Sequence, residues 1–80
     1  MTVRERLRRF IQDSFLVDDF QDEDSFLATG MVDSLGLMQL VAFIESEFAM
    51  KVSDSELVPE NFDSVACVAA FVERKQARAA

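Results

Sequence analysis

The sequence predicts an all-α fold, a small antiparallel bundle of three main helices and one short helix, with a long first loop. Three segments place their apolar residues at helical spacing, and none of the chain shows the alternation of a β-strand. Half of the 80 residues are hydrophobic, which argues against disorder. We expect residues 1–80 to form one domain with one small core.

The first helix is expected to run from about Val3 to about Phe15. Thr2 and Glu5 have the spacing of a capping box, in which each side chain bonds the other residue's backbone N–H. Apolar residues then recur at helical spacing, so one face of this helix should be buried. Its four arginines lie off that face and are expected to point to solvent.

Residues 18–29 resemble neither a regular helix nor a strand, and they are predicted to form the long loop. We expect Phe20, Phe26 and Leu27 to attach this acidic loop to the core. The segment is acidic but does not match the calcium loop of an EF-hand, because no register supplies alternate ligands, glycine at the sixth position and glutamate at the twelfth. Residues 26–29 are expected to form a single turn that ends at Gly30.

The second helix has the clearest pattern, and Asp33 or Ser34 is expected to be its N-cap. At about 100° per residue, one narrow sector collects the residues predicted to be buried: Leu37, Leu40, Val41, Ile44 and Phe48. The opposite face is predicted to be exposed and carries Leu35, Met38, Gln39, Ala42 and Ser46, with Glu45 at its edge.

Residues 52–62 are predicted to connect this helix to the last one. One short turn is expected after Ser53, and Pro59 should limit the helix that can follow it. The last helix should begin after a cap at Asp63 or Ser64, and its basic residues should complement the dipole at its end. Its buried face is predicted to hold Val65, Val68, Ala69 and Val72, with Phe71 at the flank.

The composition excludes several classes of site. Without histidine, the chain has no Ser-His or Cys-His nucleophile pair. Its one cysteine, Cys67, rules out an internal disulfide, and two glycines are too few for a glycine-rich phosphate loop. No apolar run reaches the roughly 18 residues of a membrane span, and no signal-peptide pattern follows Met1. We therefore expect a cytoplasmic protein that is not an enzyme.

Acidic charge is concentrated in the middle of the chain. Residues 18–63 hold twelve acidic residues and one lysine, a net charge of −11, whereas the segments on either side each have a net charge of +2. An acidic body of this kind argues against nucleic-acid binding, which requires lysine and arginine. It is compatible with basic protein partners, and equally with an ordinary solvated surface.

Ser34 is the candidate site for a modification. It is one of five serines that follow an aspartate, but only here does a glycine turn precede and a long patterned helix follow. The free N–H groups at a helix start favour an attached phosphate. Leu35 and Met38 would offer an exposed apolar contact beside it. The alternative is that Ser34 only caps the helix.

The segment Phe26 to Leu35, read as FLATGMVDSL, resembles the attachment segment of acyl carrier proteins, and Leu37 to Phe48 resembles their second helix. The resemblance covers nearly the whole chain and implies a monomeric carrier without catalysis of its own. It implies that a magnesium-dependent phosphopantetheinyl transferase moves 4′-phosphopantetheine from coenzyme A to Ser34, between Asp33 and Leu35. The thiol of that group would hold acyl intermediates as thioesters for fatty acid, lipid or secondary-metabolite synthesis. The implied partner surface consists of Asp33, Leu35, Met38, Gln39, Ala42, Glu45 and Glu47.

Two positions depart from the carriers of fatty-acid synthesis, which usually have acidic residues at the positions of Gly36 and Gln39. Gly36 also weakens the helix by about 1 kcal/mol relative to alanine. These departures indicate a specialised carrier, whose cargo is an unusual acyl chain, an aminoacyl group such as D-alanine, or a polyketide or peptide intermediate. Its partners would be a ligase, synthase or acyltransferase with a basic docking surface. Two other classes remain open, an unmodified acidic adaptor that binds a basic protein and a minimal carboxylate enzyme.

Overall fold

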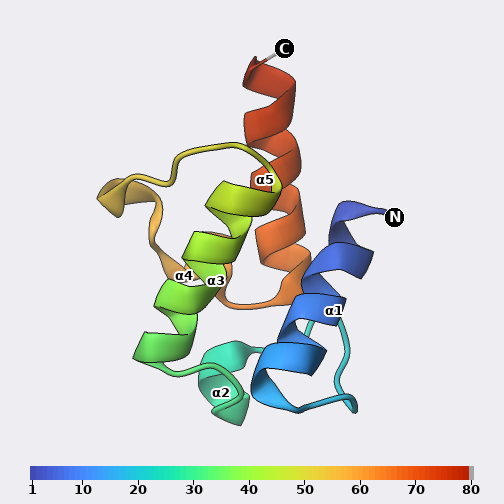
Figure 1. Ribbon diagram of the computed structural model, residues 1–80. Helices are drawn as coiled ribbons and strands as arrows, with labels where there is room; N and C mark the ends of the chain where they lie inside the picture. The colour runs from blue at the N-terminus through green and yellow to red at the C-terminus, as the bar shows by residue number, and fades with distance from the viewer. Residues whose placement is uncertain (80) are drawn as a thin grey trace.

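Three long helices frame the protein: α1 (Val3–Phe15), α3 (Ser34–Glu47) and α5 (Val65–Ala79). The computed structural model describes residues 1–79, and within them no strand occurs. Helix α1 runs opposite to α3 and α5, which point in roughly the same direction (Figure 1). The all-α fold class expected from the sequence is therefore confirmed.

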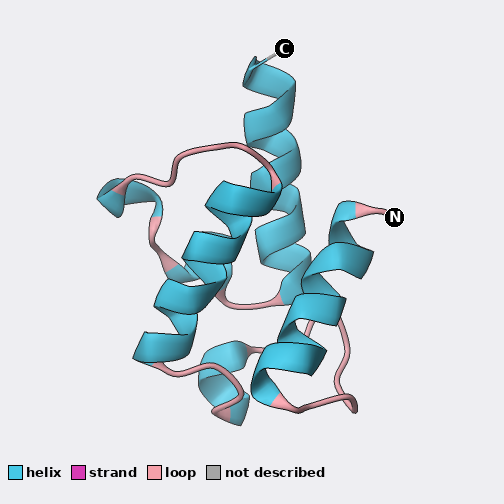
Figure 2. Ribbon diagram, viewed as in Figure 1, coloured by secondary structure: helices cyan, strands magenta, loops and turns pink. Residues whose placement is uncertain are grey.

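Three short helices lie in the connections between the long ones: α2 (Phe26–Thr29), the 3₁₀ turn η1 (Asp54–Glu56) and α4 (Pro59–Phe62) (Figure 2). The turn expected over residues 26–29 and the short turn expected after Ser53 are confirmed as α2 and η1, whereas α4 was not expected. Pro59 begins α4, which is only four residues long. A proline fits the first turn of a helix, where its missing N–H would have no partner. Among residues 1–79, no helix has both the length and the apolar character needed to cross a membrane.

Helix α1 has the bounds that its capping box and its apolar spacing predicted. The Thr2 N–H donates to Glu5 Oε1 at 2.8 Å, and the Glu5 N–H donates to Thr2 Oγ1 at 3.1 Å. The first of these bonds lowers the pKa of Glu5, because it stabilises the charged carboxylate. The helix ends where Leu16 turns into the left-handed region at φ 55°.

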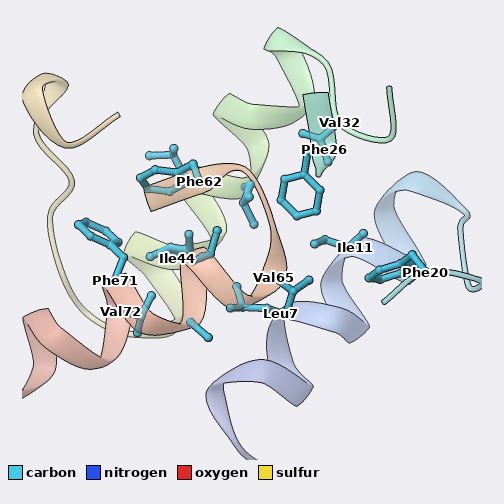
Figure 3. Packing of buried hydrophobic residues seen from close by; sticks show 14 residues of the cluster. Leu7, Ile11, Phe20, Phe26, Val32, Ile44, Phe62, Val65, Phe71 and Val72 are labelled. Atoms are coloured by element: carbon cyan, nitrogen blue, oxygen red, sulfur yellow. The ribbon is translucent and has the colours of Figure 1, made fainter. Parts of the chain in front are cut away.

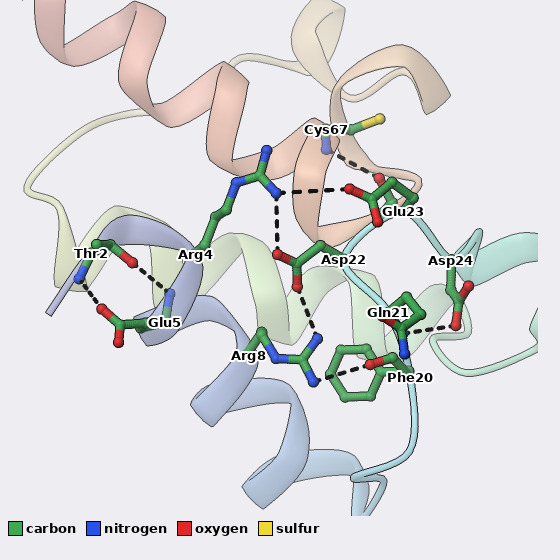
Figure 4. A network of polar contacts seen from close by, with 11 residues as sticks. Thr2, Arg4, Glu5, Arg8, Phe20, Gln21, Asp22, Glu23, Asp24 and Cys67 are labelled. Atoms are coloured by element: carbon green, nitrogen blue, oxygen red, sulfur yellow. Dashed lines mark hydrogen bonds and ion pairs between the residues drawn. The ribbon is translucent and has the colours of Figure 1, made fainter.

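The first loop is held to α1 by Arg8, which corrects the expectation that all four arginines point to solvent. Arg8 is half-buried, its guanidinium lies 4.3 Å from the centre of the Phe20 ring, and it donates to the Phe20 carbonyl at 3.0 Å (Figure 4). It also pairs with Asp22 at 2.8 Å, and Arg4 pairs with the same carboxylate at 3.1 Å. Partial burial alone would raise the pKa of Asp22, but these two arginines outweigh it, and the pKa is lowered.

Side chains from the three long helices and from the first loop fill the core (Figure 3). The most deeply buried are Leu7, Ile11, Leu40, Ile44, Val65, Val68 and Val72. Of the other expected buried positions of α3 and α5, Val41 and Ala69 are also buried, whereas Leu37 and Phe48 are half-buried. Phe20 and Phe26 attach the loop to this core as expected, whereas Leu27 is 72% exposed and the prediction for it is wrong.

Two cations of α5 that were expected to complement its dipole bind side chains elsewhere. Lys75 pairs with Glu56 of η1 at 2.9 Å and also donates to the Lys51 carbonyl. Arg74 donates to the side chain of Asn61 in α4 at 3.0 Å. These contacts fasten the η1 and α4 connection to α5, which places that connection opposite the start of α3.

Candidate attachment site at the start of helix α3

Ser34 is the first residue of α3 and is exposed to solvent. The cap of this helix is Asp33, whose Oδ1 accepts from the Gly36 N–H at 2.7 Å and whose carbonyl accepts from the Leu37 N–H at 2.8 Å. Within the described part of the chain, no hydrogen bond engages the Ser34 hydroxyl. The sequence left open whether Asp33 or Ser34 is the N-cap. The structure shows that Asp33 is the N-cap, so the Ser34 hydroxyl has no capping role.

The start of α3 suits a covalently attached phosphate. With Gly36 and Leu37 bonded to Asp33, the N–H groups of Ser34 and Leu35 are the ones in this turn without an intrahelical acceptor. The positive end of the helix dipole lies at the same place, so a negative group on Ser34 Oγ would be stabilised. Gly30, at φ +71°, ends α2 and turns the chain toward this site.

A mainly apolar pocket of about 410 Å³ opens beside Ser34. One wall comes from α2, a second from the first turn of α3, and a third from the connection that contains α4. The lining residues are Phe26, Leu27, Val32, Asp33, Ser34, Leu37, Leu57, Val58, Pro59, Phe62 and Asp63. A flexible group on Ser34 would therefore have an apolar surface next to its attachment point.

Asp63 joins two walls of this pocket. Its carboxylate accepts from Ser25 Oγ at 2.7 Å and from the Leu27 N–H at 3.0 Å, and its carbonyl accepts from the Phe26 N–H. Ser25 in turn caps α2, because its side chain accepts from the Ala28 N–H at 3.0 Å. The short helix α2 is thus held at the junction of α4 and α5, beside the start of α3.

Three exposed apolar side chains lie near Ser34. Leu35 is 70% exposed and Met38 is 55% exposed, as the helical phase of α3 predicted. Leu27, which lines the pocket with Ser34, was missed as a surface residue. The signal was present in the sequence, since a four-residue helix that buries Phe26 turns the next side chain about 100° away from the core.

The remaining residues of the predicted partner surface differ in whether their side chains already have a partner within the protein. Gln39 and Ala42 are exposed on the same face of α3 as Met38. Glu47 pairs with Arg6 of α1 at 2.9 Å, and Glu45 accepts from the Val52 N–H at 2.9 Å. The two carboxylates therefore have partners within the protein, which sequence reasoning did not foresee.

Residues 3–72 match the protein family described as phosphopantetheine attachment site. The D-alanyl carrier protein of Streptococcus uberis is 40% identical over 70 residues, covering 81% of this chain and 84% of that protein. The D-alanyl carrier proteins of Streptococcus pyogenes serotypes M5 and M1 are each 38% identical over 69 residues, covering 86% of this chain and 82% of theirs.

Proposed function

Because the chain belongs to the phosphopantetheine attachment family, we propose that it is an aminoacyl carrier whose cargo is D-alanine and whose attachment residue is Ser34. Domains of this family hold 4′-phosphopantetheine covalently and are carriers without catalysis of their own. The proposal that the cargo is D-alanine rests on the similarity to D-alanyl carrier proteins over more than four-fifths of the chain. It favours the aminoacyl alternative over carriage of acyl chains for fatty acid or lipid synthesis.

The filled core supports a small cargo. Leu7, Leu40, Ile44 and Val72 each have no exposed surface, and together they occupy the space between the long helices. A long acyl chain could pass beyond the pocket beside Ser34 into this space only by displacing such side chains, at a cost in packing. An aminoacyl group on the end of a flexible arm requires no such opening.

The residues around Ser34 fit the prosthetic group. Ser34 Oγ would form the phosphodiester as the pyrophosphate bond of coenzyme A breaks and 3′,5′-ADP leaves, and the transferase would accept the hydroxyl proton. The N–H groups of Ser34 and Leu35 would face the resulting phosphate. When bound, the group supplies a flexible arm with a terminal thiol that carries the cargo as a thioester.

Intact mass measured after incubation with coenzyme A, magnesium and a promiscuous phosphopantetheinyl transferase tests the attachment residue. We expect one phosphopantetheine on the wild-type protein and none on Ser34→Ala. The matched control is Ser14→Ala, which changes an exposed serine that also follows an aspartate and should still be loaded. An unmodified wild-type protein would favour the adaptor, and a loaded Ser34→Ala variant would place the group elsewhere.

The cargo is tested on the loaded protein with ATP and a D-alanine ligase. D-alanine should add to the thiol of the arm, and hydroxylamine, which cleaves thioesters, should release it. A fatty acid offered together with an acyl ligase should not compete with D-alanine for this thiol. Preferential acylation by a long-chain fatty acid would contradict the aminoacyl proposal and leave the attachment proposal intact.

The partners in this proposal are the transferase and an aminoacyl ligase with a basic docking surface. Leu35, Met38, Gln39 and Ala42 would form the exposed face of α3 that meets them, next to Asp33. A cytoplasmic, monomeric carrier of a single domain completes the proposal.

A further inference from the structure

Gly36 is buried on the side of α3 that faces α1. A Cβ atom at this position would lie 2.8 Å from Cε1 and 3.1 Å from Cζ of Phe15, and 3.2 Å from Oδ1 of Asp33. Atoms at the first of these distances would clash, so one of the neighbours would have to move. The glycine therefore lets the last residue of α1 approach the first turn of α3 closely.

Phe15 begins an aromatic series formed by Phe15, Phe10, Phe43 and Phe48, so a turn of its ring would break its contact with Phe10. Phe15 meets Phe10 edge-on at 6.1 Å between ring centres, and Phe10 stacks on Phe43 at 4.3 Å. Phe43 meets Phe48 edge-on at 6.2 Å, at the far end of α3. The rings thus couple the end of α1 to α3 along its length.

The same turn of α3 carries both the cap and the candidate attachment serine. Asp33 Oδ1, which accepts from the Gly36 N–H, lies close to the space that a Cβ at Gly36 would need. A shift of this turn away from Phe15 would consequently disturb the cap. It would also move Ser34, which lies between Asp33 and Gly36 in the chain. Group transfer is sensitive to such shifts, since a misplacement of about 1 Å can reduce a rate about 100-fold.

We propose that the contact between Phe15 and Gly36 positions Ser34 for phosphopantetheinyl transfer, so that Phe15 is a positioning residue for a modification made 19 residues further along the chain. The inference rests on the proposed assignment of Ser34.

A double-mutant cycle tests the contact, with Gly36→Ala, Phe15→Leu and the double variant. Alanine is a better helix former than glycine, which offsets part of the cost of displacing the ring or the turn with its methyl group, so Gly36→Ala should lower the melting temperature only moderately. Leucine lacks the Cε1 and Cζ atoms that this methyl group would meet. We expect kcat for loading to fall about 10- to 100-fold in Gly36→Ala with KM nearly unchanged, and to fall also in Phe15→Leu, where the contact is lost. In the double variant the new methyl group can fill the space left by the smaller side chain, so kcat should recover relative to both single variants, and a Phe15→Leu variant that is loaded at the wild-type rate would overturn the positioning role.

Two controls separate positioning from stability. Phe48→Leu makes the same chemical change at the other end of the aromatic series, and it should lower the melting temperature without altering loading. Ser46→Ala adds helix propensity at an exposed position of α3 and should leave loading unchanged. All rates are measured well below each variant's melting temperature.

The outcomes are distinct. A wild-type protein that accepts no phosphopantetheine would overturn the proposed function and this inference together. If the wild type is loaded and Gly36→Ala is loaded at the same rate, only the positioning role is overturned. A double variant that is still loaded slowly would also overturn the positioning role, because Gly36 would then act without Phe15. A loss of loading in Phe48→Leu that matches its loss of stability would overturn it as well, because loading would then follow stability.

Discussion

The Ser34 hydroxyl has a different environment from the hydroxyls of two other serines that follow an aspartate. Ser25 Oγ accepts from the Ala28 N–H, and Ser64 Oγ accepts from the Cys67 N–H at 3.1 Å, so each caps a helix. At Ser34 the preceding aspartate makes the cap instead. The Ser34 hydroxyl is therefore not used for capping and is available for modification. Capping by Asp33 and the proposed attachment at Ser34 do not compete, because they involve adjacent residues.

Leu35 and Met38 are the residues at which docking can be separated from stability. Because both side chains are more than half exposed, Leu35→Ala and Met38→Ala should change the free energy of unfolding by no more than about 0.5 kcal/mol. If the transferase docks on this face, its kcat/KM for loading should fall several-fold. Chemical denaturation and loading kinetics measure the two effects. A large loss of stability would show that these side chains belong to the core.

Helix α3 presents opposite properties on its two faces, and Ile44→Ala tests the inner one. Ile44 has no exposed surface, so truncation should cost about 2–5 kcal/mol through lost burial and the cavity left behind. The whole stability of a small domain is roughly 5–15 kcal/mol, so the variant should be partly unfolded when warmed. Thermal and chemical denaturation provide the measurement. A loss near zero would mean that the helix is rotated relative to the structure.

The contact between η1 and α5 should make stability depend on pH. The hydrogen bond from the Ser53 N–H and the pairing with Lys75 lower the pKa of Glu56 from its ordinary value of 4.5 to about 2. Since the folded-state pKa lies below the unfolded one, this carboxylate stabilises the fold fully above about pH 4.5, and the contribution disappears as pH falls to about 2. Glu56→Gln should therefore show a shallower loss of unfolding free energy across this interval than the wild type. Equal slopes would contradict the assignment.

The helices with local signals were predicted, including the four residues of α2 before Gly30, whereas α4 was not. The capping box of Thr2 and Glu5 gave both bounds of α1 when combined with the apolar spacing. In contrast, α4 was missed because its four residues show no period, and it is held to α5 through Asn61 and Arg74, which are 13 residues apart. A short helix of this kind forms because of packing rather than propensity.

At the scale of the whole molecule, the acidic charge should speed encounter with basic partners. The net charge is −7, and the acidic middle of the chain contains the candidate site. Raising the ionic strength from about 0.1 M to about 1 M shortens the screening length from about 10 Å to about 3 Å. The apparent association rate with a basic transferase should therefore fall, while the melting temperature measured in parallel checks that the fold survives. A rate that does not depend on salt would assign docking to apolar contacts alone.

The sequence by itself determined the all-α class, the bounds of α1, the exposed and buried faces of α3 and α5, and the choice of Ser34 as candidate. Capping and helical periodicity act within about four residues, so these features can be read locally. The tertiary structure decided which residues meet across the chain. Arg8 meets Asp22, Asp63 holds α2, Arg6 takes Glu47, and Phe15 lies against Gly36. Partners in such contacts lie between 14 and 41 residues apart, and only the packing of the helices brings them together.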